Sequence, residues 1–228
     1  MKLLLFDIDG TLLRANTSGR RAIEDALSKL CGCQISTEAV GFSGKTDPQI
    51  MHDILRINGL DPDASPALVE DALDAYEEVA LHTLQPEDVE ILPGVSYLLD
   101  RLRGASHIQL ALLTGNIESM AFRKLEAVQL DGYFSFGAFG SDHADRNELP
   151  AVALDRARHH TGHPFGGADT VIIGDTARDI ACSRVIGAVA VGVCTGHYSR
   201  ADLEPHNPDV LLDDLSNPSD FLRHVPAM

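Results

Sequence analysis

A short apolar run that ends in two carboxylates limits what this chain can fold into more than any other feature. Residues 3–6 read Leu-Leu-Leu-Phe, the pattern of a strand buried on both faces, and residues 7–11 read Asp-Ile-Asp-Gly-Thr. Residues two apart along a strand point to the same side, so Asp7 and Asp9 can share one pocket at the carboxyl end of the strand. Open α/β sheets bind their ligands at that end. The segment therefore predicts a buried strand with a ligand site beside it.

The two carboxylates indicate the chemistry of that site. At this separation they repel each other, and a cation between them or a proton on one of them relieves the repulsion. Gly10 allows the backbone to approach a ligand closely, and the Thr11 hydroxyl can donate a hydrogen bond. An ordinary Asp-Gly turn after a strand is the alternative explanation. Polar residues at the ends of other predicted strands would favour a ligand site over such a turn.

Two later apolar runs also end in polar residues. Residues 110–113 lead into Thr-Gly-Asn at 114–116, where a hydroxyl and backbone amides at a helix start suit a phosphate, as well as an ordinary turn. Residues 171–173 precede Asp175, and Asp179 follows on the same face of a helix that starts there. Three predicted strand ends therefore carry candidate site residues.

The order of predicted elements indicates the fold class. Up to residue 90 the apolar residues recur at helical spacing, with candidate helices through 23–30, 50–55 and 66–84. From residue 91, candidate strands alternate with helices, which implies a parallel, doubly wound α/β sheet. These strands are Gln109–Leu113, Phe134–Phe139, Val171–Ile173, Val189–Val193 and Val210–Leu212. The predicted organisation is an α/β catalytic core of residues 1–15 and 88–228, with a helical cap inserted at 16–87.

Composition excludes some partners. The formal charge of −16 argues against nucleic acid, which requires a basic surface, but not against a small anionic substrate. The four cysteines form no Cys-x-x-Cys pair and are expected to be reduced thiols of a cytoplasmic protein. The apolar start is too short for a signal peptide, and no apolar stretch reaches membrane-spanning length, so no membrane partner is expected.

Taken together, these segments resemble the signatures of the haloacid dehalogenase-like (HAD) hydrolases, in the phosphatase form Asp-x-Asp-Gly-Thr. The resemblance covers nearly the whole chain, is closest to the phosphoglycolate phosphatase-like branch, and implies a Rossmann-like core with an α-helical cap. It implies that Asp7 attacks phosphorus and forms an aspartyl phosphate. It further implies that Asp9 protonates the leaving oxygen and then activates water, and that Thr114 holds the transferring phosphoryl group.

The resemblance also implies a magnesium site and a substrate-binding surface. Magnesium is expected among four carboxylates, with Asp175 the better direct ligand and Asp179 either a ligand or a residue that orients one; the four are Asp7, Asp9, Asp175 and Asp179. The residues expected to contact substrate are Gly10, Thr11, Gly115, Asn116 and, from a cap loop, Lys45. Arg20 and Arg21, on the first cap helix, are further candidates.

The chain departs from the family at the third signature. Relatives place a lysine between the phenylalanine-rich strand and the next helix, and residues 142–150 contain none. Arg146 is the nearest cation and is the predicted catalytic substitute, because a guanidinium can bridge a carboxylate and a phosphate. Lys124, on the helix after Thr114, is the rival and is interpreted as a solvated helix charge.

The sequence therefore favours magnesium-dependent hydrolysis of a phosphate monoester of a small metabolite. A sugar phosphomutase of the same superfamily is the alternative, because such relatives use the same two aspartates. They commonly follow Asp-Gly with valine or isoleucine, where this chain has Thr11. A non-catalytic metabolite-binding or regulatory protein is the second alternative, favoured only by the missing lysine.

Overall fold

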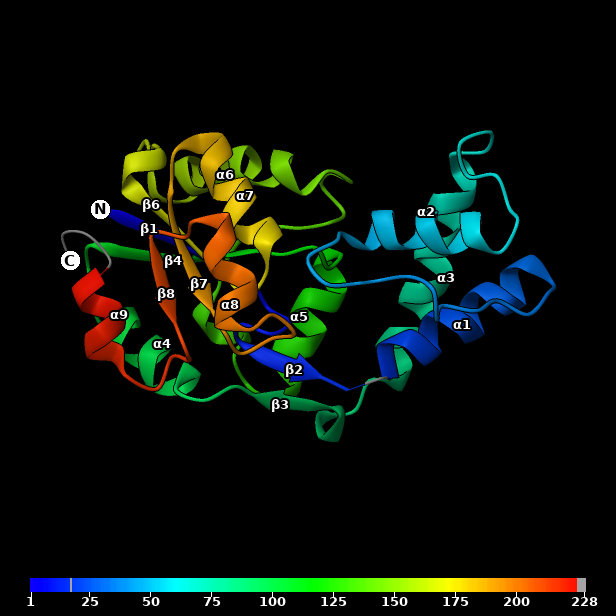
Figure 1. The fold of residues 1–228 in the computed structure, drawn as a ribbon, viewed down its shortest axis with the longest axis horizontal. Coiled ribbons are helices and arrows are strands. Elements are labelled where there is room, and N and C mark those ends of the chain that lie inside the picture. Colours follow the sequence, from blue (N-terminus) through cyan, green and yellow to red (C-terminus); the bar gives the residue numbers. More distant parts are fainter. Residues whose placement is uncertain (17, 225–228) are drawn as a thin grey trace.

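A parallel sheet forms the core of the computed structural model, which describes residues 1–16 and 18–224 (Figure 1). The strand order is β5-β4-β1-β6-β7-β8, and every pair is parallel. The strands are β1 (Lys2–Phe6), β4 (Ile108–Leu113), β5 (Gly137–Ala138), β6 (Thr170–Gly174), β7 (Val189–Val193) and β8 (Val210–Leu212). Because β1 lies between β4 and β6, the three strand ends with candidate site residues are neighbours. The predicted doubly wound α/β class is confirmed.

The apolar run of β1 is buried on both faces, which explains why it does not alternate with polar residues. Leu3 and Leu5 pack with residues of α6 and α7, whereas Leu4 and Phe6 pack with residues of α4 and α9. The core helices are α4 (Val95–Arg103), α5 (Glu118–Ala127), α6 (Leu149–Thr161), α7 (Ala177–Ile186), α8 (Arg200–Leu203) and α9 (Pro218–His224). Among the described residues, no helix is both long and apolar enough to cross a membrane.

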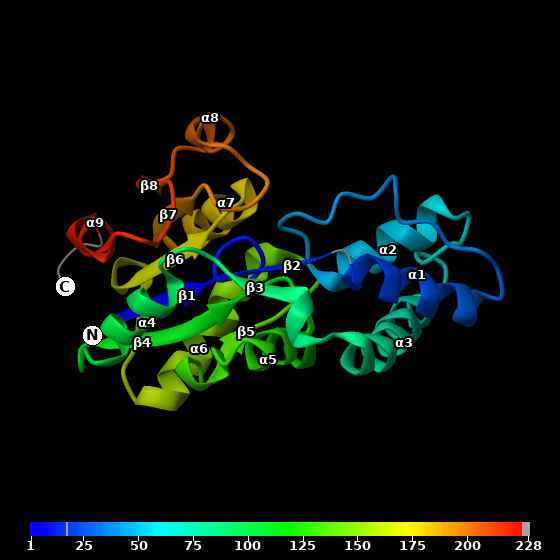
Figure 2. The same cartoon turned by 90° about the horizontal axis from the view of Figure 1, so that it is seen from below.

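The cap consists of three helices set to one side of the sheet (Figures 1 and 2). They are α1 (Ser18–Cys31), α2 (Asp47–Ile57) and α3 (Ala67–Thr83). A two-stranded antiparallel ribbon of β2 (Leu13–Ala15) and β3 (Val89–Ile91) lies where the chain leaves and re-enters the core. The sequence does not predict this ribbon, because three-residue strands are too short to show a period. Short 3-10 helices are η1 (Pro86–Asp88), η2 (Asp131–Tyr133), η3 (Arg146–Glu148), η4 (Gly167–Asp169) and η5 (Glu204–His206).

The predicted strand Phe134–Phe139 differs most from the structure, where the strand β5 is only Gly137–Ala138. Phe134 and Phe139 are both buried in the core. Phe134 meets Phe6 edge to face, with ring centroids 6.1 Å apart. Phe134 and Phe139, which suggested a long strand, therefore place their rings in the core on the face of the sheet that carries Phe6, instead of extending the hydrogen-bond ladder.

Two glycines with nearly the same positive φ allow a test of the packing. Gly94, before α4, has φ +83°, and a Cβ there would lie 2.1 Å from the carbonyl carbon of Leu215. Gly59 has φ +81° and open space around it. We expect Gly59→Ala to cost about 1–2 kcal/mol through backbone strain alone. We expect Gly94→Ala to cost about 2–5 kcal/mol, because overpacking is added to that strain. Urea unfolding curves of the two variants check this, and equal losses would contradict it.

Candidate active site

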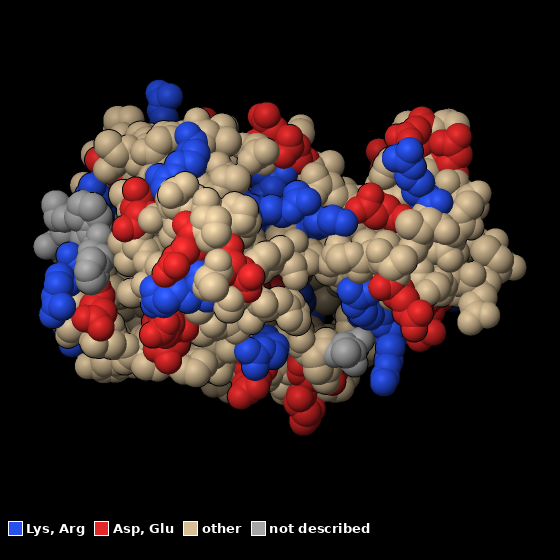
Figure 3. Space-filling model, viewed as in Figure 1, with Lys and Arg blue, Asp and Glu red and all other residues tan. Residues whose placement is uncertain are grey.

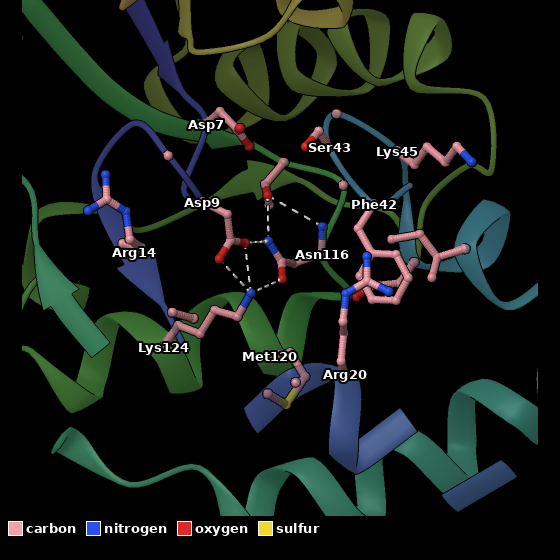
Figure 4. Close-up of a pocket in the computed structure, with 18 of the residues that line it drawn as sticks. Asp7, Asp9, Arg14, Arg20, Phe42, Ser43, Lys45, Asn116, Met120 and Lys124 are labelled. Atoms are coloured by element: carbon pink, nitrogen blue, oxygen red, sulfur yellow. Dashed lines mark hydrogen bonds and ion pairs between the residues drawn. The ribbon is translucent and has the colours of Figure 1, made fainter. Parts of the chain in front are cut away.

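A cavity of about 680 Å³ lies where the carboxyl ends of the core strands face the cap (Figure 4). Over the face shown in Figure 3, acidic and basic side chains are interspersed on both core and cap. The predicted site residues that line the cavity are Asp7, Asp9, Gly10, Lys45, Thr114, Gly115, Asn116, Arg146 and Asp175. The other two, Thr11 and Asp179, are buried.

Three buried carboxylates gather at the ends of β1 and β6. Asp7, Asp175 and Asp179 each offer an oxygen, and these oxygens lie within 4.8 Å of one another. Burial, with added repulsion from Asp7 and Asp179, raises the pKa of Asp175 to about 9. Burial likewise raises the pKa of Asp7 to about 6, although Arg146 opposes the rise. Without a cation among them, these carboxylates favour binding a proton over all three being ionised at once.

The donor set fits a divalent cation. Oδ1 of Asp175 is buried and has no hydrogen-bond partner among the described residues. Mutually repelling carboxylates with an unpartnered oxygen form the kind of oxygen-rich site that magnesium prefers. Magnesium, if present, would therefore be held chiefly by Asp7 and Asp175.

Backbone packing fixes the Asp175 carboxylate from two sides. A Cβ on Gly10, where φ is +87°, would lie 2.4 Å from Oδ2 of Asp175. A Cβ on Gly196 would lie 1.6 Å from the same oxygen. Any side chain at either position would displace the carboxylate. Sequence reasoning identified Gly10 but missed Gly196, which follows β7 in a loop without a recognisable signature.

Arg146 enters the carboxylate cluster from η3, between β5 and α6. Its side chain is buried, and Nη2 lies 3.1 Å from Oδ1 of Asp7 and 2.5 Å from Oδ1 of Asp179. The other oxygen of Asp179 accepts hydrogen bonds from the backbone N–H and the hydroxyl of Thr176, which caps α7. Both oxygens of Asp179 are thus occupied, which makes it the least free of the three carboxylates to bind a cation directly.

Asp9 is not part of the cluster of three carboxylates, and its side chain points away from Asp7 toward Lys124 and Asn116 (Figure 4). Nζ of Lys124 lies 2.9 and 2.7 Å from its two carboxylate oxygens. The amide of Asn116 donates to Asp9 Oδ2 at 2.7 Å and to the Thr114 hydroxyl at 2.8 Å, while its carbonyl accepts from Lys124 at 2.6 Å. The carboxylate of Asp9 thus lies against an ammonium group, and its role as a magnesium ligand stays a prediction.

The interpretation of Lys124 as a solvated helix charge is wrong. Only 12% of its side chain is exposed, and it forms an ion pair with Asp9. The reason lies in the packing of α5, which starts just after the end of β4 and carries Lys124 over the cavity. Asp7 and Asp9 therefore each have a cation beside them, with Arg146 at Asp7 and Lys124 at Asp9.

The cap loop before α2 packs closely against the core loop after β4. The backbone N–H of Asp47 donates to the Gly115 carbonyl at 2.7 Å, and the Asp47 carboxylate accepts from the N–H of Ile117 at 2.8 Å. Burial raises the pKa of Asp47 to about 6. Sequence reasoning missed Asp47, because an aspartate between Thr46 and Pro48 is typical of any helix start.

Lys45 contributes to this contact through its backbone. A Cβ on Gly115 would lie 2.1 Å from the Lys45 carbonyl oxygen, so only glycine fits there. The Lys45 ammonium forms an ion pair with Asp53 of α2 at 2.6 Å. Figure 4 shows this side chain directed away from Asp9 and Lys124. Substrate contact by Lys45, a prediction from the sequence, would require that ion pair to open.

Known proteins resemble this chain in sequence and in structure. A family model described as haloacid dehalogenase-like hydrolase matches residues 4–193. The chain is similar to a phosphoglycolate phosphatase of Pseudomonas syringae pv. tomato, with 24% identity over 94% of this chain and 77% of that protein. A predicted phosphatase from Clostridium acetobutylicum has a similar structure, with a TM-score of 0.74, 17% identity and coverage of 97% of this chain and 98% of that one. A β-phosphoglucomutase from Clostridium difficile gives a TM-score of 0.72 at 16% identity, covering 98% and 96%.

The two solved structures show a shared fold and do not separate hydrolase from mutase. The family match carries more weight, because it includes the strand ends with Asp7, Thr114 and Asp175. The chain therefore belongs to the haloacid dehalogenase-like hydrolase family.

Proposed function

We propose that the chain is a cytoplasmic, magnesium-dependent phosphomonoester hydrolase that acts on a small phosphorylated metabolite. One observation carries the proposal: Asp7 lines the cavity with Asp175, whose buried Oδ1 has no hydrogen-bond partner among the described residues, and Asp7 lies 3.1 Å from the buried Arg146 guanidinium. A carboxylate attacking a phosphate dianion needs fixed positive charge nearby to offset their repulsion. Relatives named phosphoglycolate phosphatase support a phosphate monoester as the substrate class.

In the first step, a carboxylate oxygen of Asp7 bonds to phosphorus while the bond from phosphorus to the leaving oxygen breaks. Asp9 gives a proton to that oxygen, which departs as an alcohol. Both Asp9 oxygens contact Lys124 or Asn116, so one of them has to exchange that contact for the leaving group. The Thr114 hydroxyl and the amides after it are suited to hold the phosphoryl oxygens.

In the second step, water attacks the aspartyl phosphate. Asp9 takes a proton from the water while the water oxygen bonds to phosphorus. The bond between phosphorus and Asp7 then breaks and releases inorganic phosphate. Arg146 holds the Asp7 carboxylate in place through both steps. Magnesium, held by Asp7 and Asp175 with Asp179 behind them, would offset charge on the phosphoryl oxygens.

The first prediction concerns the nucleophile. We expect Asp7→Asn to lower turnover by about 10⁴-fold or more, because a neutral amide does not attack phosphorus. The measurement is phosphate release from an aryl phosphate with magnesium present. Asp213→Asn, at an exposed carboxylate after β8 that pairs with Arg200, is the control and should retain activity. A near-normal rate for Asp7→Asn would rule out its role, and retention of the phosphoryl group on a hexose phosphate by the unmodified protein would favour the mutase.

The second prediction concerns the metal. Chelation should abolish activity, and Asp175→Asn should raise the magnesium concentration for half-maximal activity by about 100-fold or more, because it removes a charged oxygen from the site. Magnesium titrations after chelation provide the measurement. Asp169→Asn, at the other end of β6, should leave the magnesium requirement unchanged. Full activity in chelator would contradict the proposed cofactor.

The third prediction concerns Arg146. Arg146→Met leaves Asp7 and Asp179 buried without their cation, so we expect a loss of about 3–5 kcal/mol in the free energy of unfolding and a large loss of turnover. Arg146→Lys should recover part of both, because it restores charge without the planar fork. Arg184→Met removes a half-exposed ion pair with Asp209 and should cost less than about 1 kcal/mol. Urea unfolding and turnover assays decide, and wild-type values for Arg146→Met would refute its role.

A further inference from the structure

The cavity is larger and more apolar than hydrolysis of a phosphate group alone requires. Its volume of about 680 Å³ falls within the range of about 300–1,000 Å³ typical of pockets that bury drug-sized ligands. Apolar and aromatic side chains from the cap and from the neighbouring part of the core line it. They are Ala22, Ile23, Phe42, Ile50, Tyr76, Ala80, Leu84 and Met120. Such a lining favours an apolar body on the leaving group, because burying that body removes apolar surface from water on both sides.

One cation, Arg20, is fixed within this apolar lining. Its Nη1 and Nη2 donate to the backbone carbonyls of Thr37 at 2.8 Å and Val40 at 2.9 Å, and its guanidinium lies 3.8 Å from the centre of the Phe42 ring. Glu24 anchors the same turn by accepting two hydrogen bonds from Thr37. Figure 4 shows Arg20 beside Phe42, apart from the Asp9–Lys124 pair.

The Arg20 guanidinium has more N–H donors than these two hydrogen bonds use. An arginine side chain carries five N–H donors, and the two carbonyls engage only part of them. Among residues 1–16 and 18–224, no carboxylate lies within 4.0 Å of this guanidinium. Glu24 interacts electrostatically with Arg20, but its carboxylate is already engaged by Thr37. A rigid arginine on an aromatic ring beside a cavity is suited to bind a carboxylate of a ligand.

We propose that the substrate is a phosphate monoester whose leaving group has a bulky apolar body and a carboxylate that binds Arg20. This inference rests on the proposed hydrolase function for the reaction at Asp7. It makes Arg20 a specificity-determining residue, and it predicts that a two-carbon acid such as glycolate is too small a leaving group to use the apolar lining.

Three esters test the proposal: para-carboxybenzyl phosphate, benzyl phosphate and phosphoglycolate. The two benzyl esters differ only in the remote carboxylate, so their kcat/KM ratio isolates its recognition. We expect a ratio of about 10–100 in the wild-type protein, the range that a hydrogen bond to a charged group provides. We expect phosphoglycolate to have a kcat/KM at least about tenfold below that of para-carboxybenzyl phosphate.

Two neighbouring arginines provide the matched variants. Arg20→Met should bring the ratio of the benzyl esters close to one. Arg21→Met should leave it unchanged, because Arg21, the other candidate on α1 from the sequence, is exposed and does not line the cavity. Because Arg20→Met also removes bonds to the cap turn, it can slow both esters alike, and the ratio cancels that loss. A wild-type ratio near one, a ratio unchanged by Arg20→Met, or phosphoglycolate as the best ester would overturn the proposal.

A binding measurement separates this inference from the hydrolase proposal. para-Carboxybenzylphosphonate has a carbon–phosphorus bond in place of the ester, and calorimetry reports its affinity without turnover. Binding weakened about 10-fold or more by Arg20→Met, with no hydrolysis of any ester, would support the ligand class while refuting the reaction. Hydrolysis of the esters with binding insensitive to Arg20→Met would retain the reaction and refute the ligand class.

Discussion

The buried contacts of Arg146 with Asp7 and Asp179 hold together the part of the molecule on which the site depends. A buried charge is costly unless it is paired, and three carboxylates at neighbouring strand ends multiply that cost. The guanidinium meets two of them at once and leaves the third, Asp175, with a buried oxygen that has no partner among the described residues. The same uncompensated negative charge that costs the fold stability therefore makes this cluster one that could hold a metal ion.

A second constraint is the close approach of cap and core. Gly115 has no room for a side chain against the Lys45 carbonyl, and Asp47 makes two hydrogen bonds to the loop that contains Gly115. The loop that follows β4 thus serves both domains, since the Asn116 amide donates to Asp9 and to Thr114 while the backbone of the loop supports the cap. The cavity owes its shape to this shared loop.

The sequence predicts the family and the core strands well, because each strand end with Asp7, Thr114 or Asp175 follows a fully apolar run and belongs to a recognisable signature. The direction of long side chains is harder to predict. Lys124 covers Asp9 and Lys45 pairs with Asp53, and both outcomes depend on how a helix packs rather than on local pattern. Short ribbons and the glycine at 196 likewise depend on contacts between distant segments. The roles assigned to the site residues remain predictions for the experiments above.

The two edge strands of the sheet have a consequence for the protein in concentrated solution. An exposed strand edge offers a row of N–H and C=O groups that can pair with another chain. Here β5 has two residues and β8 has three, and an Arg200 side chain donates to the Leu211 carbonyl of β8. Edge strands this short offer few N–H and C=O groups for a neighbouring molecule to pair with. The sheet is therefore a poor template for edge-to-edge aggregation, even though its inner strands are almost entirely apolar.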